Sequence, residues 1–95
     1  MTHAPSDEVR DNPARHRFEL EADGHLAIAV DSLAPGVVPF IHTEVPDALA
    51  GRGIGSRLAK GALAQVRDRG LKVVPRCPFI RGYIEKHPEW QDLLA

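Results

Sequence analysis

The sequence predicts a small α/β domain, in which a mostly antiparallel sheet is followed by an amphipathic helix and a strand parallel to its neighbour. Three observations support this fold class. Residues 16–22 and 26–30 alternate between apolar and other side chains on either side of an Asp-Gly pair, which indicates a β-hairpin. Apolar residues recur at helical spacing over residues 54–66. The short apolar run 71–74 completes a strand, helix, strand order, which favours a parallel crossover.

Length and composition limit the kinds of protein that this chain can be. Its 95 residues suit one core, because two smaller pieces would each bury too little apolar surface. Apolar residues make up 43% and charged residues 26%, as in soluble globular proteins. A net charge of -1 supplies no basic field for nucleic acid, and no apolar run approaches the roughly 20 residues of a membrane span. Because a secretion signal is also absent, we expect a cytoplasmic protein that binds neither nucleic acid nor membrane.

The first fourteen residues differ in composition from the rest of the chain. They are rich in Pro, Asp, Asn and Ser, and Val9 is their sizeable aliphatic side chain after Met1. They follow neither the helical nor the strand period. We therefore expect a disordered tail over residues 1–14 and one domain over residues 15–95.

The middle of the chain predicts a third strand and a covered sheet face. Residues 37–45 are rich in β-branched side chains, and a proline ends the run. Pro39 lacks a backbone N–H, so we expect a bulge or a partly unpaired edge there. Ala27 and Ala29 are small and share one face of the second hairpin strand. Another element should therefore lie closely against that face.

The C-terminal segment predicts a second helix over residues 78–86 and a final turn over residues 88–90. Leu93 and Leu94 are expected to dock on the body of the domain. The remaining large apolar side chains of this segment are expected in the core: Phe79, Ile80, Ile84 and Trp90.

A glycine-rich turn, Gly51-Arg52-Gly53-Ile54-Gly55-Ser56, precedes the first predicted helix. Glycine lets a backbone approach a phosphate closely, and the first N–H groups of a helix point at such an anion. Arg52 would add charge near the phosphates, and Ser56 a hydroxyl. The turn is not a P-loop, because no Gly-Lys-Ser/Thr follows, and it lacks the third glycine of the dinucleotide fingerprint. Its pattern alone fits either an anion cradle or a tight turn that begins a helix.

Cys77 and His42 are the candidate reactive residues. The single cysteine has no partner for a disulfide, a zinc site or thiol redox chemistry, and we expect no metal. Its thiolate could attack an acyl thioester if a cation such as Arg76 or a protonated histidine lowered its pKa. The alternative is a small buried apolar side chain. His42 could act as a general base, or it could hydrogen-bond a neighbouring carbonyl as a structural residue.

The sequence of residues 45–58 is Val-Pro-Asp-Ala-Leu-Ala-Gly-Arg-Gly-Ile-Gly-Ser-Arg-Leu. This segment strongly resembles the coenzyme-binding segment of GNAT-like N-acetyltransferases. The family pattern is Gln or Arg, two variable residues, Gly, one variable residue, then Gly or Ala. Gly53 and Gly55 match this pattern, whereas Ala50 stands where Gln or Arg is usual. Residues 42–46, 74–79 and 87–90 resemble a subfamily of minimal GNAT-like proteins, so that the resemblance covers about residues 16–94.

The resemblance implies a trimmed GNAT fold, with a mostly antiparallel sheet, a pyrophosphate-binding helix and a splayed parallel strand pair that holds coenzyme A. In the family the pantetheine arm lies along the backbone of Thr43, Glu44 and Val45, and a tyrosine that Tyr83 resembles reprotonates the coenzyme thiolate. The cysteine that matches Cys77 is the proposed catalytic residue of the minimal subfamily. The pyrophosphate site that the resemblance implies is Gly51, Arg52, Gly53, Ile54, Gly55 and Ser56.

Two functions remain open from the sequence. The first is transfer of an acetyl group from acetyl-CoA to an amine acceptor, either a small molecule or a protein. It would proceed by direct attack aided by His42 or through a short-lived acyl-Cys77. The second is a coenzyme A-binding module with little or no transfer activity that acts through a protein partner. Compared with the larger GNAT enzymes that it resembles, the chain lacks much of the first helix region that encloses their acceptors, so we expect a shallow and open acceptor side.

Overall fold

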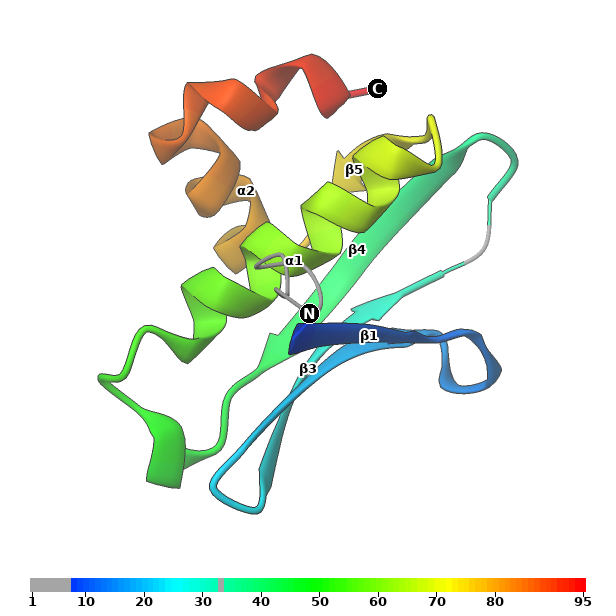
Figure 1. Ribbon diagram of the computed structural model, residues 1–95. Helices are drawn as coiled ribbons and strands as arrows, with labels where there is room; N and C mark the ends of the chain where they lie inside the picture. Colours follow the sequence, from blue (N-terminus) through cyan, green and yellow to red (C-terminus); the bar gives the residue numbers. More distant parts are fainter. Residues whose placement is uncertain (1–7, 33) are drawn as a thin grey trace, which may run out of the picture.

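The computed structural model describes residues 8–32 and 34–95, and the strands of this part form one sheet in the order β1-β2-β3-β4-β5 (Figure 1). Neighbouring strands are antiparallel, except for β4 and β5, which are parallel. The predicted α/β fold with a mostly antiparallel sheet is confirmed. The strands are β1 (Val9–Asn12), β2 (Arg17–Ala22), β3 (His25–Asp31), β4 (Val37–Glu44) and β5 (Lys72–Pro75). The helices are α1 (Ile54–Asp68), α2 (Pro78–Lys86) and the 3₁₀ helices η2 (Pro13–Arg15), η3 (Asp47–Leu49) and η4 (Pro88–Leu93).

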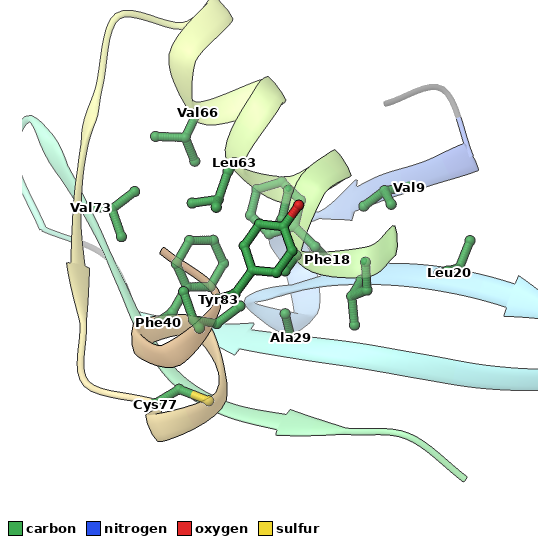
Figure 2. Close-up of a cluster of buried hydrophobic side chains, with 14 of the residues drawn as sticks. Val9, Phe18, Leu20, Ala29, Phe40, Leu63, Val66, Val73, Cys77 and Tyr83 are labelled. Atoms are coloured by element: carbon green, nitrogen blue, oxygen red, sulfur yellow. The ribbon is translucent and has the colours of Figure 1, made fainter. Parts of the chain in front are cut away.

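Helices α1 and α2 cover one face of the sheet, and the core lies between them and the strands (Figures 1 and 2). Ala27 and Ala29 are fully buried on this face, where α1 contacts β3. Their small side chains allow the close approach that the sequence predicts. Leu26 lies on the other face and is 38% exposed. Within residues 8–32 and 34–95, no helix is long and apolar enough to cross a membrane.

The predicted hairpin turn joins β2 to β3. Asp23 and Gly24 both have positive φ angles, of 50° and 77°, and Ala22 pairs with His25 directly after them. Positive φ at both central residues is the requirement of the type I′ turn, which fits the twist of a two-residue hairpin. An Asp-Gly pair meets this requirement at low cost, so the turn also sets the register of the two strands.

Strand β1 lies within the segment that the sequence assigns to a disordered tail, and for residues 9–14 that prediction is wrong. Val9 is 2% exposed and pairs with Leu20 of β2. Its side chain packs against Gly61 of α1, where an added Cβ would lie 2.3 Å from Val9 Cγ2. Residues 1–7 of the expected tail lie outside the described residues.

Strand β4 contains the bulge and the splay that position the functional site. Val30 pairs with His42 and Asp31 with Phe40, so Ile41 is the extra residue. The sequence predicted the irregularity at Pro39, but it lies two residues further along the strand. Pairing of β4 with β5 ends at Phe40 and Pro75, whereas β4 remains paired with β3 as far as Glu44. The two parallel strands thus separate beyond Phe40.

The C-terminal segment forms the predicted helix α2 and ends in η4. Leu93 is buried as predicted, whereas Leu94 is 42% exposed and adds its backbone to the edge of β5 through a bridge to Val73. Phe79 is also 42% exposed, which contradicts its predicted place in the core. The other three residues predicted for the core, Ile80, Ile84 and Trp90, are buried.

Candidate functional site

The glycine turn places an unobstructed helix N-terminus beside the end of β4. Gly51 and Gly53 have φ angles of 76° and 70°, which side chains rarely adopt, and Gly53 is the N-cap of α1. The first turn of α1 contains no acidic residue, and Arg67 lies in its last turn. The first N–H groups of this 15-residue helix have no partner within it, and the positive end of its dipole lies here. The turn has the conformation and polarity of an anion cradle.

Two adjoining hollows extend along this N-terminus. The loop hollow has a volume of about 270 Å³ and runs from the end of β4 over the glycine turn. The helix hollow, of about 240 Å³, lies between the start of α1 and α2. Ser56 and Phe79 line both. The loop hollow is also lined by Val45, Leu49, Ala50, Gly51, Gly53, Ile54 and Gly55. The helix hollow is also lined by Pro78, Gly82, Tyr83, Lys86 and His87.

Cys77 lies where β4 and β5 separate. Its N–H donates a hydrogen bond to the carbonyl oxygen of Phe40 at 2.8 Å, which fixes the start of α2 against β4. Its Sγ lies 3.1 Å from Oγ1 of Thr43, and the residue is 3% exposed. Among the described residues, the group within hydrogen-bonding reach of this thiol is therefore a neutral hydroxyl, whereas the sequence suggested a cation.

His42 lies on the opposite face of the sheet from Cys77. Consecutive side chains of a strand point to opposite faces, so the contact of Thr43 with Cys77 directs His42 to the face that α1 and α2 leave uncovered. Its Nε2 lies 3.2 Å from Oε2 of Glu44, and both side chains are more than half exposed. The structure does not bring the two predicted catalytic side chains together.

Tyr83 lines the helix hollow, but its hydroxyl points away from Cys77 (Figure 2). Burial raises the pKa of Tyr83, and Glu89 raises it further, while the neighbouring Trp90 indole opposes the shift. Its ring stacks on that of His87 at a centroid distance of 4.0 Å. Nδ1 of His87 donates a hydrogen bond to the carbonyl oxygen of Tyr83 at 2.8 Å, which secures the end of α2.

Arg52 is directed at the β2–β3 turn. Its guanidinium donates a hydrogen bond to a carboxylate oxygen of Asp23, and both side chains are largely exposed. In this arrangement the turn carboxylate partly neutralises a cation that the sequence assigned to phosphate binding. Arg52 is part of the glycine turn, but its side chain is held at the β2–β3 turn.

The side chains of Thr43 and Phe79 belong to the site, which the sequence did not predict. Thr43 was expected to contribute its backbone, yet its hydroxyl contacts Cys77. Phe79 was expected in the core, yet it lines both hollows. The spacing of Ile80, Tyr83 and Ile84 contained the signal for Phe79, because these three positions make the buried stripe of α2 and leave residue 79 beside it.

Comparison with known proteins shows the family and the fold of this chain. The model of the family described as GCN5-related N-acetyl-transferase matches residues 17–93. The chain is 34% identical over 83 residues to Protein NATD1 of Homo sapiens, with coverage of 84% of this chain and 74% of that protein. It is 33% identical over 84 residues to Protein NATD1 of Gallus gallus, with coverage of 85% and 76%. A GCN5-like protein from Staphylococcus aureus has a solution structure that matches with a TM-score of 0.71 and 26% identity, covering 93% of this chain and 87% of that one. The chain belongs to the GCN5-related N-acetyltransferase family.

Proposed function

We propose that the chain binds acetyl-CoA along the two hollows and transfers its acetyl group to an amine. The observation that carries this proposal is the continuity between the glycine turn and the splay. The loop hollow runs from the α1 N-terminus to Val45, just past the end of β4, and Thr43 of that strand contacts Cys77. A donor held at the turn by its pyrophosphate could therefore extend along β4 to the thiol.

The described residues fit such a donor in two respects. The N–H groups at the start of α1 suit the pyrophosphate. The edge of β4 beyond Phe40 is not paired with β5, so the backbone of Thr43, Glu44 and Val45 can hydrogen-bond an extended arm. The bound donor supplies an activated acetyl thioester. In this proposal the chain holds that thioester between β4 and the start of α2, beside Cys77.

Cys77 can take part as a nucleophile. Its Sγ would attack the thioester carbonyl, a new carbon–sulfur bond would form, and the thiol proton would pass to the departing coenzyme sulfur. An amine would then attack the acetyl-cysteine, forming the amide and returning one proton to Sγ. Thr43 Oγ1, 3.1 Å from Sγ, can donate a hydrogen bond to the thiolate in both steps.

The alternative transfer route uses His42 and no acyl-enzyme. The uncovered face of the sheet carries His42 beside Glu44, 3.2 Å away, whose carboxylate can orient the ring. An amine that approaches the splay from this face could lose its proton to His42 and attack the thioester directly. This route assigns the donor and the acceptor to opposite faces.

One observation favours a second function, that of a coenzyme A-binding module that acts through a protein partner. Cys77 is 3% exposed, and a hydroxyl already contacts its thiol. A buried cysteine of this kind is usually an inert small apolar side chain. The cradle and the hollows would serve binding equally well without any transfer.

Intact-mass measurement after incubation with acetyl-CoA tests these alternatives. Wild-type protein and Cys77→Ser are each incubated alone and with a pool of amines and basic peptides. The acyl-cysteine route predicts that, without an acceptor, the wild type gains the mass of one acetyl group and Cys77→Ser gains none. Full acceptor modification by Cys77→Ser would exclude that route and favour His42. Tight coenzyme binding with no modified acceptor would favour the binding module.

A further inference from the structure

Phe79 is an apolar ring left 42% exposed on a helix whose neighbouring apolar side chains are buried. We propose that this ring is a wall of the coenzyme groove that bound coenzyme A contacts, and that residue 55 is glycine in order to seat the ring rather than to admit the phosphate. The inference rests on the proposed function, because the occupant of the groove is coenzyme A.

The position of the ring supports a contact with the coenzyme. The loop hollow and the helix hollow meet at Ser56 and Phe79, the two residues that line both. A ligand long enough to extend from the glycine turn into the helix hollow must pass between or over these side chains. Coenzyme A has that length, and its nucleotide and its pantetheine arm both carry apolar surface. Covering an exposed aromatic ring is favourable because it removes apolar area from water.

The three glycines of the turn are glycine for different structural reasons. Gly51 and Gly53 have positive φ angles, and an added Cβ at either would meet no atom within 4 Å. Gly55 lies in α1 without a positive φ, and an added Cβ there would lie 2.8 Å from Phe79 Cζ and 3.3 Å from each Cε. Gly51 and Gly53 are therefore required by the backbone, whereas Gly55 is required by the ring of Phe79.

The helix itself would favour another residue at this position. Glycine in a helix interior is less favourable than alanine by about 0.5–1 kcal/mol, which is an upper limit for Gly55 at the second position of α1. The turn accepts this cost at Gly55 because the ring occupies the space that a methyl group would need. The atoms that an added methyl group would meet belong to the far end of the exposed Phe79 side chain. The methyl group would therefore displace the ring instead of unfolding the domain.

A double-mutant cycle on coenzyme A binding tests the assignment. Calorimetry compares wild type, Gly55→Ala, Phe79→Ala and the double variant, with Leu94→Ala as a control because Leu94 has the same 42% exposure and lies outside both hollows. We expect Phe79→Ala to weaken binding about tenfold through the loss of apolar contact. Gly55→Ala should weaken binding in the wild-type background and have no further effect in Phe79→Ala, and Leu94→Ala should bind as the wild type does.

Thermal unfolding without ligand gives an independent readout. In the Phe79→Ala background, Gly55→Ala should raise Tm by up to about 4 °C, because the helix gains alanine and nothing is displaced. The gain should be smaller or reversed when the ring is present. Equal Tm shifts in the two backgrounds would overturn the seating of the ring.

Two binding outcomes would overturn the rest of the inference. If Gly55→Ala weakens coenzyme binding by the same factor with and without the ring, Gly55 admits the phosphate as the family pattern suggests. If Phe79→Ala binds coenzyme A as tightly as the wild type, the ring is no part of the groove. Failure of the wild type to bind coenzyme A would instead refute the proposed function, and the Tm cycle would still decide why residue 55 is glycine.

Discussion

The hydroxyl oxygen of Thr43 lies 3.1 Å from the sulfur of Cys77, although 34 positions separate the two residues in the chain. The contact joins β4 to the start of α2 at the point where the parallel strands separate. It places a hydrogen-bonding hydroxyl on the thiol that the proposed acyl transfer uses. The two residues are therefore expected to act together.

Thr43→Val should slow transfer while leaving the fold and coenzyme affinity in place. Valine keeps the β-branched shape, so the change removes the hydroxyl and little else. We expect transfer and the alkylation of Cys77 to slow about tenfold, the usual weight of a hydrogen bond to a charged group. Thr43→Ser, which keeps the hydroxyl, should recover most of the rate. Equal rates for Thr43→Val and the wild type would show that the hydroxyl has no part in the reaction.

Gly53→Val should weaken coenzyme A binding at least about tenfold, because a β-branched residue is strained at positive φ and distorts the N-terminus of α1. Gly36→Val is a matched control: its φ is 73°, close to the 70° of Gly53, and it also has open space around the Cβ position. Both variants should lose stability in thermal unfolding. Calorimetry should find the affinity loss in Gly53→Val alone, and the same loss in Gly36→Val would point to general destabilisation.

Asp23→Asn should strengthen coenzyme A binding about twofold to fivefold at low salt, because it releases the guanidinium of Arg52 from its carboxylate partner. Asparagine tolerates the positive φ of this turn position, so the hairpin should persist. The gain should shrink at high salt and should disappear in Arg52→Ala. A gain that survives removal of Arg52 would place the effect elsewhere.

Asp31→Asn should stabilise the protein near neutral pH. Burial raises the pKa of Asp31, and Asp11 raises it further, against the opposing effects of His16 and Arg69. Between the unfolded pKa, about 3.9, and the raised folded pKa, the folded state binds the proton more readily, so stability falls as pH rises through this window. Above the window the charged carboxylate costs stability, which the asparagine removes.

The Tm gain of Asp31→Asn should therefore be largest at neutral pH and should vanish as the pH falls to the ordinary range of aspartate. Glu85→Gln, at an exposed position of α2, is the control and should change Tm little at any pH. A gain from Asp31→Asn that is constant with pH would mean that packing, not titration, is responsible.

Local rules were enough to predict the elements whose requirements lie close together in the chain. The hairpin follows from Asp23-Gly24, and α1 follows from its apolar period after Gly53. Strand β1 could not be predicted in this way, because Val9 is its one buried residue and a single apolar side chain makes no alternating pattern. The strand depends instead on its pairing with β2. Tertiary pairing thus decided what local sequence did not.

The site was predictable in its backbone parts and less so in its side chains. The positive φ of Gly53 follows from residue type and position, whereas the contact of Thr43 with Cys77 depends on how β4 meets α2. The alternation of β4 would have separated His42 from Thr43 onto opposite faces. The bulge at Ile41 shifts this alternation by one residue, so simple alternation counted from Phe40 assigns His42 to the wrong face of the sheet.

The packing of Val9 against Gly61 has a consequence for how this chain can vary over evolutionary time. An added Cβ at residue 61 would lie 2.3 Å from Val9 Cγ2 and 2.6 Å from Val9 Cβ, and both residues are buried, so neither can yield on its own. A larger residue at position 61 is therefore admissible only with a smaller one at position 9. Related sequences should show the two positions changing as a pair, a covariation that links the edge strand to the helix beginning at the glycine turn.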